Sequence, residues 1–285
     1  MNCNYIYLRD RLLIDRMADD TPSQGMHPSF VGVIRQKERL REKLSSIRHK
    51  IGIYSAKGGV GKTTVAINLA YTLSKKGFKV GILDADIDTP NVPLFLGMTE
   101  KMDISGFPLR PLVKDGVKVA STAMIVDDMR KPIIWRGPII VKMLGDFFEN
   151  TEWGDLDYLI LDLPPGTSDS PLTVMQVLEL DGFIIVTTPQ KIAAINSIRS
   201  GIMAKRLNVP LLGIVENMSG GDASDNTMEA AEALDTGLLG VVRLDKKYNR
   251  YSDIGSVPVL EDGDSFREFD SIAGKLLGDF SDSKP

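Results

Sequence analysis

Residues 57–64 combine three glycines, two lysines and two threonines. A glycine-rich turn can point backbone N–H groups at a phosphate, and the N-terminus of a following helix adds partial positive charge. In such a loop Lys62 reaches the β- and γ-phosphates of a nucleotide, and the Thr63 hydroxyl binds Mg²⁺. Ala56 stands where the strict phosphate-loop pattern has glycine, a difference of one methyl group. We therefore predict a nucleotide-binding site made of Lys57, Gly58, Gly59, Val60, Gly61, Lys62, Thr63 and Thr64.

Three aspartates end or follow apolar runs elsewhere in the chain. Asp84 and Asp86 follow residues 78–83, and Asp162 follows Tyr158-Leu-Ile-Leu161. Mg²⁺ prefers oxygen ligands and keeps much of its water, so we predict that it is held by Thr63, Asp84 and Asp162, directly or through water. Asp86 is the candidate for positioning or activating the attacking water. The alternative, that Asp86 only orders its own loop, stays open because Asp-Thr-Pro-Asn, residues 88–91, is a strong turn.

Alternating strands and helices must bring these residues together. Predicted strands cover residues 51–54, 78–84, 117–121, 158–163, 183–187, 211–216 and 238–244. Predicted helices cover residues 5–17, 34–50, 138–149, 170–180, 191–207, 227–234 and 265–277, besides one directly after the glycine-rich loop. Ser265 and Glu268 form the expected capping box of the last helix. Such alternation predicts a three-layer, doubly wound α/β fold with a mostly parallel sheet, whose ligands bind at the carboxyl ends of the strands.

Composition sets the bounds for these hypotheses. The 285 residues are 43% hydrophobic and 25% charged, with a net charge of −4 from 34 basic and 38 acidic residues. This balance argues against broad nucleic-acid binding. There is no apolar run of membrane-spanning length and no signal peptide, and the one cysteine, Cys3, excludes a disulfide framework. We expect a cytoplasmic protein with a flexible N-terminal extension, residues 1–33, and a single P-loop ATPase domain, residues 34–285.

Several segments together resemble one family. They are Ser55-Ala-Lys-Gly-Gly-Val-Gly-Lys-Thr-Thr64, Asp84-Ala-Asp-Ile-Asp-Thr-Pro-Asn-Val-Pro93, Trp135-Arg-Gly-Pro138, Asp157-Tyr-Leu-Ile-Leu-Asp-Leu-Pro-Pro-Gly-Thr-Ser-Asp169, Thr187-Thr-Pro-Gln190 and Gly213-Ile-Val-Glu-Asn-Met-Ser219. As a set they resemble the Mrp/ApbC family of iron–sulfur cluster carriers, a branch of the MinD/ParA class of P-loop ATPases with a deviant Walker A motif. The resemblance covers residues 35–280.

The resemblance implies a homodimeric ATPase that hydrolyses ATP slowly and helps to assemble or transfer iron–sulfur clusters. Its implied partners are a second copy of the chain and iron–sulfur assembly or client proteins. In this class the lysine at the position of Lys57 reaches the nucleotide of the partner subunit, so Lys57 joins Lys62 and Asp86 as a predicted catalytic residue. Asn217 matches the family position that reads the adenine edge, where an amide can both donate and accept hydrogen bonds. The alternative is that Asn217 is only a turn residue after a strand.

Two departures from the family pattern shape the expectations. The family places a C-x-x-C pair after the Glu-Asn-Met-Ser segment, whereas residues 220–226 contain no cysteine. Clusters are held mainly by thiolates, and Asp222 and Asp225 are hard oxygen ligands. We therefore expect no stable cluster at residues 218–226, and Cys3 is the only candidate ligand. Residues 243–247 also replace the proline-bounded loop that the family often has near the base.

Two other functions stay open at this stage. A MinD/ParA-like positioning or partner-regulating ATPase would need no cluster. Its ATP dimer would bind a membrane or DNA, but residues 280–285 lack the basic amphipathic helix of a membrane-targeting MinD. A non-catalytic nucleotide-binding module would need neither Asp86 nor Asp162.

Overall fold

In the computed structural model, the described residues are 44–87, 89–103, 105–106, 108–125, 150–166 and 178–281, with single positions 42, 147, 171, 174, 175. They fall in one compact unit, Leu40–Pro285. The predicted helix 5–17 and most of the predicted helix 138–149 lie outside the described residues. The division into an extension, 1–33, and a domain, 34–285, stays a prediction.

The described residues form one eight-stranded sheet in the order β3-β4-β2-β5-β1-β6-β7-β8. All neighbouring strands are parallel except the pair of β3 and β4. The bounds are β1 Ile47–Tyr54, β2 Val80–Asp84, β3 Leu112–Lys114, β4 Val117–Ser121, β5 Leu156–Asp162, β6 Gly182–Thr187, β7 Leu211–Ser219 and β8 Leu238–Arg243. The predicted doubly wound, mostly parallel α/β fold is confirmed.

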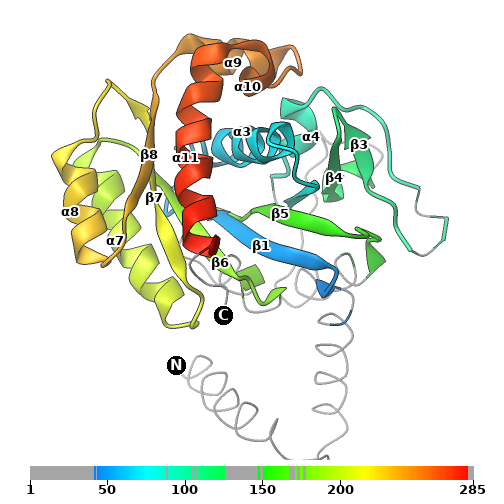
Figure 1. Cartoon of the computed structure of the whole chain (residues 1–285), viewed down its shortest axis with the longest axis horizontal. Helices are drawn as coiled ribbons and strands as arrows, with labels where there is room; N and C mark the ends of the chain where they lie inside the picture. Colours follow the sequence, from blue (N-terminus) through cyan, green and yellow to red (C-terminus); the bar gives the residue numbers. More distant parts are fainter. Residues whose placement is uncertain are drawn as a thin grey trace, which may run out of the picture. The chain divides into compact units, whose positions relative to one another are not determined.

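Helices pack on both faces of this sheet (Figure 1). α3 and α11 lie together on one face, and α7 and α8 lie together on the other. The bounds are α3 Lys62–Lys75, α4 Val92–Phe95, α7 Lys191–Lys205, α8 Asp225–Ala233, α9 Lys246–Asp253, α10 Pro258–Glu261 and α11 Gly263–Ser281, with a 3-10 turn η1 at Thr122–Met124. Because helices cover both faces, β2 and β6 are buried along their whole length, as expected for apolar strands of a parallel sheet.

The first strand begins earlier than predicted. β1 starts at Ile47, which pairs with Leu156, and residues 45–46 form a turn, so the predicted helix 34–50 is wrong for residues 45–50. The start of this strand is partly exposed and carries polar residues, which is why the sequence did not predict a strand there. The His49 ring stacks on Phe280 and Tyr158, with centroid distances of 4.1 and 5.0 Å. Polar positions at the rim of a sheet break the apolar pattern by which a buried strand is predicted.

The last helix also differs from the prediction. α11 begins at Gly263, and its first turn is capped by Asp262, whose carboxylate accepts hydrogen bonds from the Ser265 amide and hydroxyl, at 2.7 and 2.8 Å. Glu268 instead accepts a hydrogen bond from the Tyr248 hydroxyl at 2.8 Å. The predicted capping box is therefore wrong. The short elements β3, α4, α9 and α10 were not predicted either.

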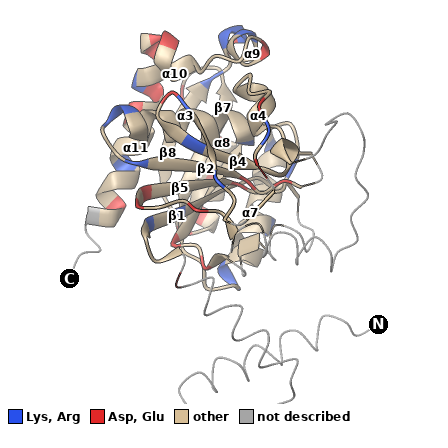
Figure 2. Cartoon of the chain, turned by 90° about the vertical axis from the view of Figure 1, so that its right-hand side faces the viewer, with Lys and Arg blue, Asp and Glu red and all other residues tan. Residues whose placement is uncertain are grey.

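Charges of both signs are interspersed on α9 and α11 (Figure 2). Lys247 is paired with Asp262 at 2.7 Å, so part of the basic character of α9 is neutralised locally. Among the described residues, no helix has the length and apolar character needed to cross a membrane.

Candidate functional site

The carboxyl ends of three neighbouring strands, β2, β5 and β1, form the centre of the site. Asp84 ends β2 and lies directly opposite Asp162, the last residue of β5. Asp162 in turn pairs with Ile53 of β1, and the glycine-rich loop begins just beyond the end of that strand. Parallel register therefore places two aspartates and the loop at the same edge of the sheet.

The loop has the backbone of a phosphate cradle. Gly59 and Gly61 have φ values of 82° and 83°, a left-handed conformation that favours glycine. Lys57, Gly58 and Gly59 are exposed, whereas Val60 is buried beneath the loop. Gly61 is the N-cap of α3 and provides no side-chain cap for the first turn. The first-turn N–H groups of this 14-residue helix, from Lys62 through Thr64, thus suit an anion.

Lys62, Thr63 and Asp162 converge at the end of β5. The Lys62 ammonium contacts Asp162 Oδ1, and the Thr63 hydroxyl donates to Asp162 Oδ2 at 2.6 Å. Lys62 and Asp162 are both buried. Charge-assisted hydrogen bonds of this kind are stronger than neutral ones. The arrangement brings together an ammonium, which can bind phosphate, and a hydroxyl and a carboxylate, which can bind Mg²⁺.

Asp84 is bound into the neighbouring loop. Its Oδ2 accepts hydrogen bonds from the Val92 amide at 3.0 Å and the Ser121 hydroxyl at 3.1 Å, and its Oδ1 accepts from the Asp86 amide at 3.3 Å. Burial, followed by the neighbouring charge of Asp162, raises the pKa of Asp84 to about 8. Asp84 therefore anchors the segment between β2 and α4, and its predicted role toward Mg²⁺ stays a prediction.

Asp86 lies in the same segment with its carboxylate buried. Oδ1 accepts from the Thr89 amide and Oδ2 from the Thr89 hydroxyl, both at 3.1 Å. Burial raises the pKa of Asp86, which is the direction that favours a proton acceptor of moderate strength. Asp88, which lies between Asp86 and Thr89 in the sequence, is outside the described part of the chain.

A divalent cation fits the oxygen atoms of Thr63 and Asp162. Mg²⁺ binds through one or two protein oxygens together with substrate phosphates and water. Among the described residues, no three or more His, Cys, Asp or Glu side chains group so as to hold a metal ion by themselves. Thr63 and Asp162 would hold the ion next to the loop.

Lys57 and Asn217 lie on different sides of the loop. The Lys57 side chain is exposed, while its carbonyl accepts a hydrogen bond from Ser55 at 3.0 Å. Asn217 is buried at the end of β7, where its Nδ2 donates to the Val60 carbonyl at 2.8 Å. The predicted role of Asn217 toward adenine stays a prediction, but this contact with the loop was not anticipated.

Three further polar residues hold the site and were missed in the sequence. Tyr54 donates its hydroxyl to the Gly166 carbonyl at 2.6 Å, Ser121 binds Asp84, and Glu216 accepts a hydrogen bond from the Ser224 hydroxyl at 2.6 Å. Glu216 is buried, and although burial alone would raise its pKa, hydrogen bonds from Ser224 and Thr227 lower it. The signal for Glu216 was present: a charged residue directly after the apolar run 212–215.

The loop where the family places cysteines is a hydrogen-bonded turn. Ser219 Oγ donates to the Asp222 carbonyl at 2.9 Å, and the exposed side chains of Asp222 and Asp225 lie beyond it. Residues 243–247 run from the end of β8 into the first turn of α9, whose N-cap Asp245 accepts from the Lys247 amide at 2.9 Å. Cys3 lies outside the described residues.

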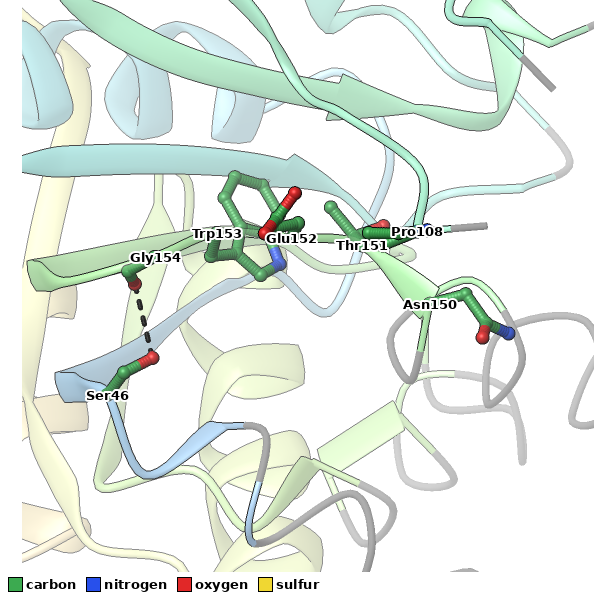
Figure 3. Close-up of a pocket in the computed structure, with 7 residues that line it drawn as sticks. All are labelled: Ser46, Pro108, Asn150, Thr151, Glu152, Trp153 and Gly154. Atoms are coloured by element: carbon green, nitrogen blue, oxygen red, sulfur yellow. Dashed lines mark hydrogen bonds between the residues drawn. The ribbon is translucent and has the colours of Figure 1, made fainter. Parts of the chain in front are cut away.

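A hollow of about 490 Å³ lies elsewhere on the molecule (Figure 3). Ser46 donates its hydroxyl to the Gly154 carbonyl at 3.1 Å on one side of it, and the Trp153 ring lies nearby. Its lining residues are Ser46, Pro108, Asn150, Thr151, Glu152, Trp153 and Gly154. Ser46 and Gly154 precede β1 and β5, so the hollow is at the amino edge of the sheet, opposite the glycine-rich loop.

Comparison with known proteins gives a consistent relationship. The ParA family profile described as "NUBPL iron-transfer P-loop NTPase" matches residues 46–277. An iron-sulfur cluster carrier protein of Methanocaldococcus jannaschii is 40% identical over 282 residues, covering 92% of this chain and 96% of that protein. One of Pyrococcus horikoshii is 38% identical over 274 residues, covering 87% and 92%.

Solved structures have the same fold. A nucleotide-binding protein from Archaeoglobus fulgidus, in complex with ADP, superimposes with a TM-score of 0.69 at 34% identity, covering 82% of this chain and 96% of that one. The cell division ATPase MinD of Pyrococcus furiosus superimposes with a TM-score of 0.62 at 23% identity, covering 81% and 99%. The second likeness shows the fold alone.

Proposed function

Since the chain belongs to the ParA family of NUBPL-type iron-transfer P-loop NTPases, we propose that it binds Mg-ATP and hydrolyses the β–γ phosphoanhydride as a homodimer. The observation that carries this proposal is the convergence of Lys62 and Thr63 on Asp162 beneath the glycine-rich loop. The ADP complex of the Archaeoglobus fulgidus relative supports nucleotide binding by this fold.

Each residue has a defined part in the proposed reaction. The N–H groups of the loop and Lys62 bind the β- and γ-phosphates, and Asp86 positions the attacking water. Lys57, exposed on the loop, reaches the nucleotide of the partner subunit and stabilises negative charge in the transition state. Mg²⁺, held by Thr63 and Asp162, would neutralise charge on the phosphate oxygens. Phosphoryl transfer depends mainly on such positioning and charge stabilisation.

The biological role that we propose is assembly or transfer of iron–sulfur clusters, with the cluster as cargo. The iron-sulfur cluster carrier proteins at 38–40% identity support this role. The chain has one cysteine, Cys3, and residues 218–226 contain none. In this proposal the cargo thiolates therefore come mainly from a client or assembly protein, and ATP hydrolysis by this chain controls the exchange.

The test is a pair of alanine variants at the two ends of α3. Lys62→Ala removes the charge aimed at the phosphates, whereas Lys76→Ala removes a lysine at the far end that is paired with Asp270. Calorimetric titration with Mg-ATP and a phosphate-release assay should show binding and turnover lost in Lys62→Ala and retained in Lys76→Ala. Equal affinity of Lys62→Ala and the wild type for Mg-ATP would reject the assignment of the phosphate site.

A further inference from the structure

The strand β7 ends in an irregularity that faces the glycine-rich loop. We propose that this bulge makes Asn217 a positioning residue for the phosphate-binding backbone, in addition to any contact that it makes with a base. The inference rests on the proposed nucleotide site and assigns to Asn217 a function that is independent of the base.

The bulge is defined by the pairing of β7 with β8. Glu216 pairs with Val241 and Ser219 pairs with Arg243, so three steps on β7 correspond to two on β8. The Ser219 carbonyl then accepts a hydrogen bond from the Leu244 amide at 2.8 Å. One extra residue in a strand bends it and redirects its side chains, and such bulges often lie next to active sites.

Met218 takes the left-handed conformation within this bulge, with φ at 57°. The other non-glycine residues with positive φ among the described residues are Asp115, Glu179, Asn208 and Asp235. Asparagine and aspartate tolerate this conformation, whereas the Cβ of methionine makes it strained. Strain of this kind persists only where the surrounding structure enforces it.

The strained bulge directs Asn217 against the back of the loop. Asn217 Nδ2 donates to the Val60 carbonyl at 2.8 Å, and the Asn217 side chain is 5% exposed. A Cβ atom at Gly61 would overlap Asn217 Nδ2 and lie 3.6 Å from Met218 Cε. Asn217 therefore contacts Val60 directly and, together with Met218, fills the space that a side chain at Gly61 would need.

The bulge is held in place by hydrogen bonds between Glu216 of β7 and Ser224. The buried Glu216 carboxylate accepts hydrogen bonds from the Ser224 amide at 3.0 Å and the Ser224 hydroxyl at 2.6 Å. Ser224 is also the N-cap of α8, so β7 and α8 are held together directly beneath Asn217. A donor mounted on so constrained a segment can hold the Val60 carbonyl, and with it the orientation of the N–H groups that follow.

The experiment separates the loop from the base by comparing Mg-ATP with Mg-tripolyphosphate, which has no base. Dissociation constants are measured by calorimetry or by competition for the wild type, Asn217→Ala and the matched control Asn226→Ala. Asn226 also donates its Nδ2 to a backbone carbonyl at 2.9 Å, but that carbonyl belongs to Pro189 and not to the glycine-rich loop. We expect Asn217→Ala to weaken Mg-tripolyphosphate about 3- to 10-fold, as for one neutral hydrogen bond, and to weaken Mg-ATP by at least the same factor. Asn226→Ala should change neither.

The outcomes are distinct. If Asn217→Ala weakens Mg-ATP but leaves Mg-tripolyphosphate unchanged, Asn217 acts only on the base and the inference is overturned. A wild-type chain that binds Mg-ATP but not tripolyphosphate also counts against it, because the loop would then not hold phosphates on its own. Failure of the wild type to bind either ligand rejects the proposed function instead. Should Asn217→Ala not fold, Asn217→Leu keeps the buried volume without the donor and takes its place.

Discussion

The Asp86 carboxylate has two explanations that one pair of variants distinguishes. It accepts two hydrogen bonds from Thr89, as a loop-ordering residue would, and it lies on the segment that follows β2 at the site. We expect Asp86→Ala to lower turnover by about 100-fold, as for the loss of a general base, with Mg-ATP affinity nearly unchanged. Single-turnover hydrolysis and equilibrium binding measure the two effects separately.

Thr89→Ala is the matched control for this prediction. It removes the hydroxyl donor and leaves the Asp86 carboxylate in place. If Asp86 acts on water, Thr89→Ala should retain most of the activity. Equal losses in Thr89→Ala and Asp86→Ala would reassign Asp86 to loop structure.

Lys57 should act only when two subunits meet. Its side chain is exposed on the loop, so Lys57→Ala should spare Mg-ATP binding and lower hydrolysis by on the order of 10³ or more, as for other trans-acting cations. A mixture of Lys57→Ala and Lys62→Ala subunits tests this directly. One site in each mixed dimer would have its own Lys62 and the partner's Lys57, so partial activity should return. Normal turnover in Lys57→Ala alone would remove this role, and so would a turnover that is lost in Lys57→Ala and does not recover in the mixed dimers.

A side chain at position 61 should destabilise the protein, whereas a side chain at position 58 should be tolerated. Gly61 has φ at 83° and faces Asn217, whereas a Cβ atom on Gly58 would meet no other atom within 4 Å. We expect Gly61→Ala to lower the free energy of unfolding by about 1–3 kcal/mol, the cost of a strained backbone conformation. Gly58→Ala should change it by less than about 0.5 kcal/mol, as at open surface positions. Urea unfolding measures both, and equal stabilities would contradict the described loop geometry.

The stability of the protein should depend on pH through Glu216, whose carboxylate connects β7 to α8. Its pKa is lowered below the ordinary 4.5, so its ionised form stabilises the fold above that value and the contribution is lost as pH falls through the lower folded pKa. Glu216→Gln should therefore cost about 1.5–3 kcal/mol at pH 7, the range for hydrogen bonds to a charged group. The difference in Tm between the variant and the wild type should shrink below pH 4.5. A constant difference from pH 7 to pH 3 would contradict this account.

Strand ends were predictable from sequence, and the bulge was not. Asp84 and Asp162 follow apolar runs, so parallel pairing alone places them together at the carboxyl edge. At the end of β7, by contrast, the segment Glu-Asn-Met-Ser has no glycine to signal a left-handed residue. The conformation of Met218 follows from long-range pairing with β8, which local propensity does not contain.

The absence of cysteine from residues 218–226 leads to a prediction about how the purified protein responds to iron and sulfide. After anaerobic reconstitution we expect no stable stoichiometric cluster at residues 218–226, because that segment provides amides, hydroxyls and carboxylates but no thiolate. Any bound iron should depend on Cys3 and disappear in Cys3→Ser, while ATP hydrolysis persists. Visible absorbance and iron counting provide the measurement. Cluster absorbance with about four irons per dimer in Cys3→Ser would overturn the prediction.

The architecture followed from the alternation of apolar strands and helices, but several of its short parts did not. β3 has three residues and pairs antiparallel, and α4 and α10 have four residues each, too few for a periodic pattern. Their positions depend on tertiary contacts. Gly97, after α4, and Gly255, after α9, approach so closely that a Cβ on Gly255 would lie 2.5 Å from the Gly97 Cα.

The two edge strands of the described sheet, β3 and β8, bear on how readily the protein aggregates. β3 offers only three residues to an incoming strand, and at β8 the Leu238 carbonyl already accepts a hydrogen bond from Lys275 at 2.9 Å. Short strands and edge lysines discourage the lateral growth by which sheets aggregate. For the described part of the sheet we therefore expect little tendency toward edge-to-edge polymers, although the inner strands are strongly apolar.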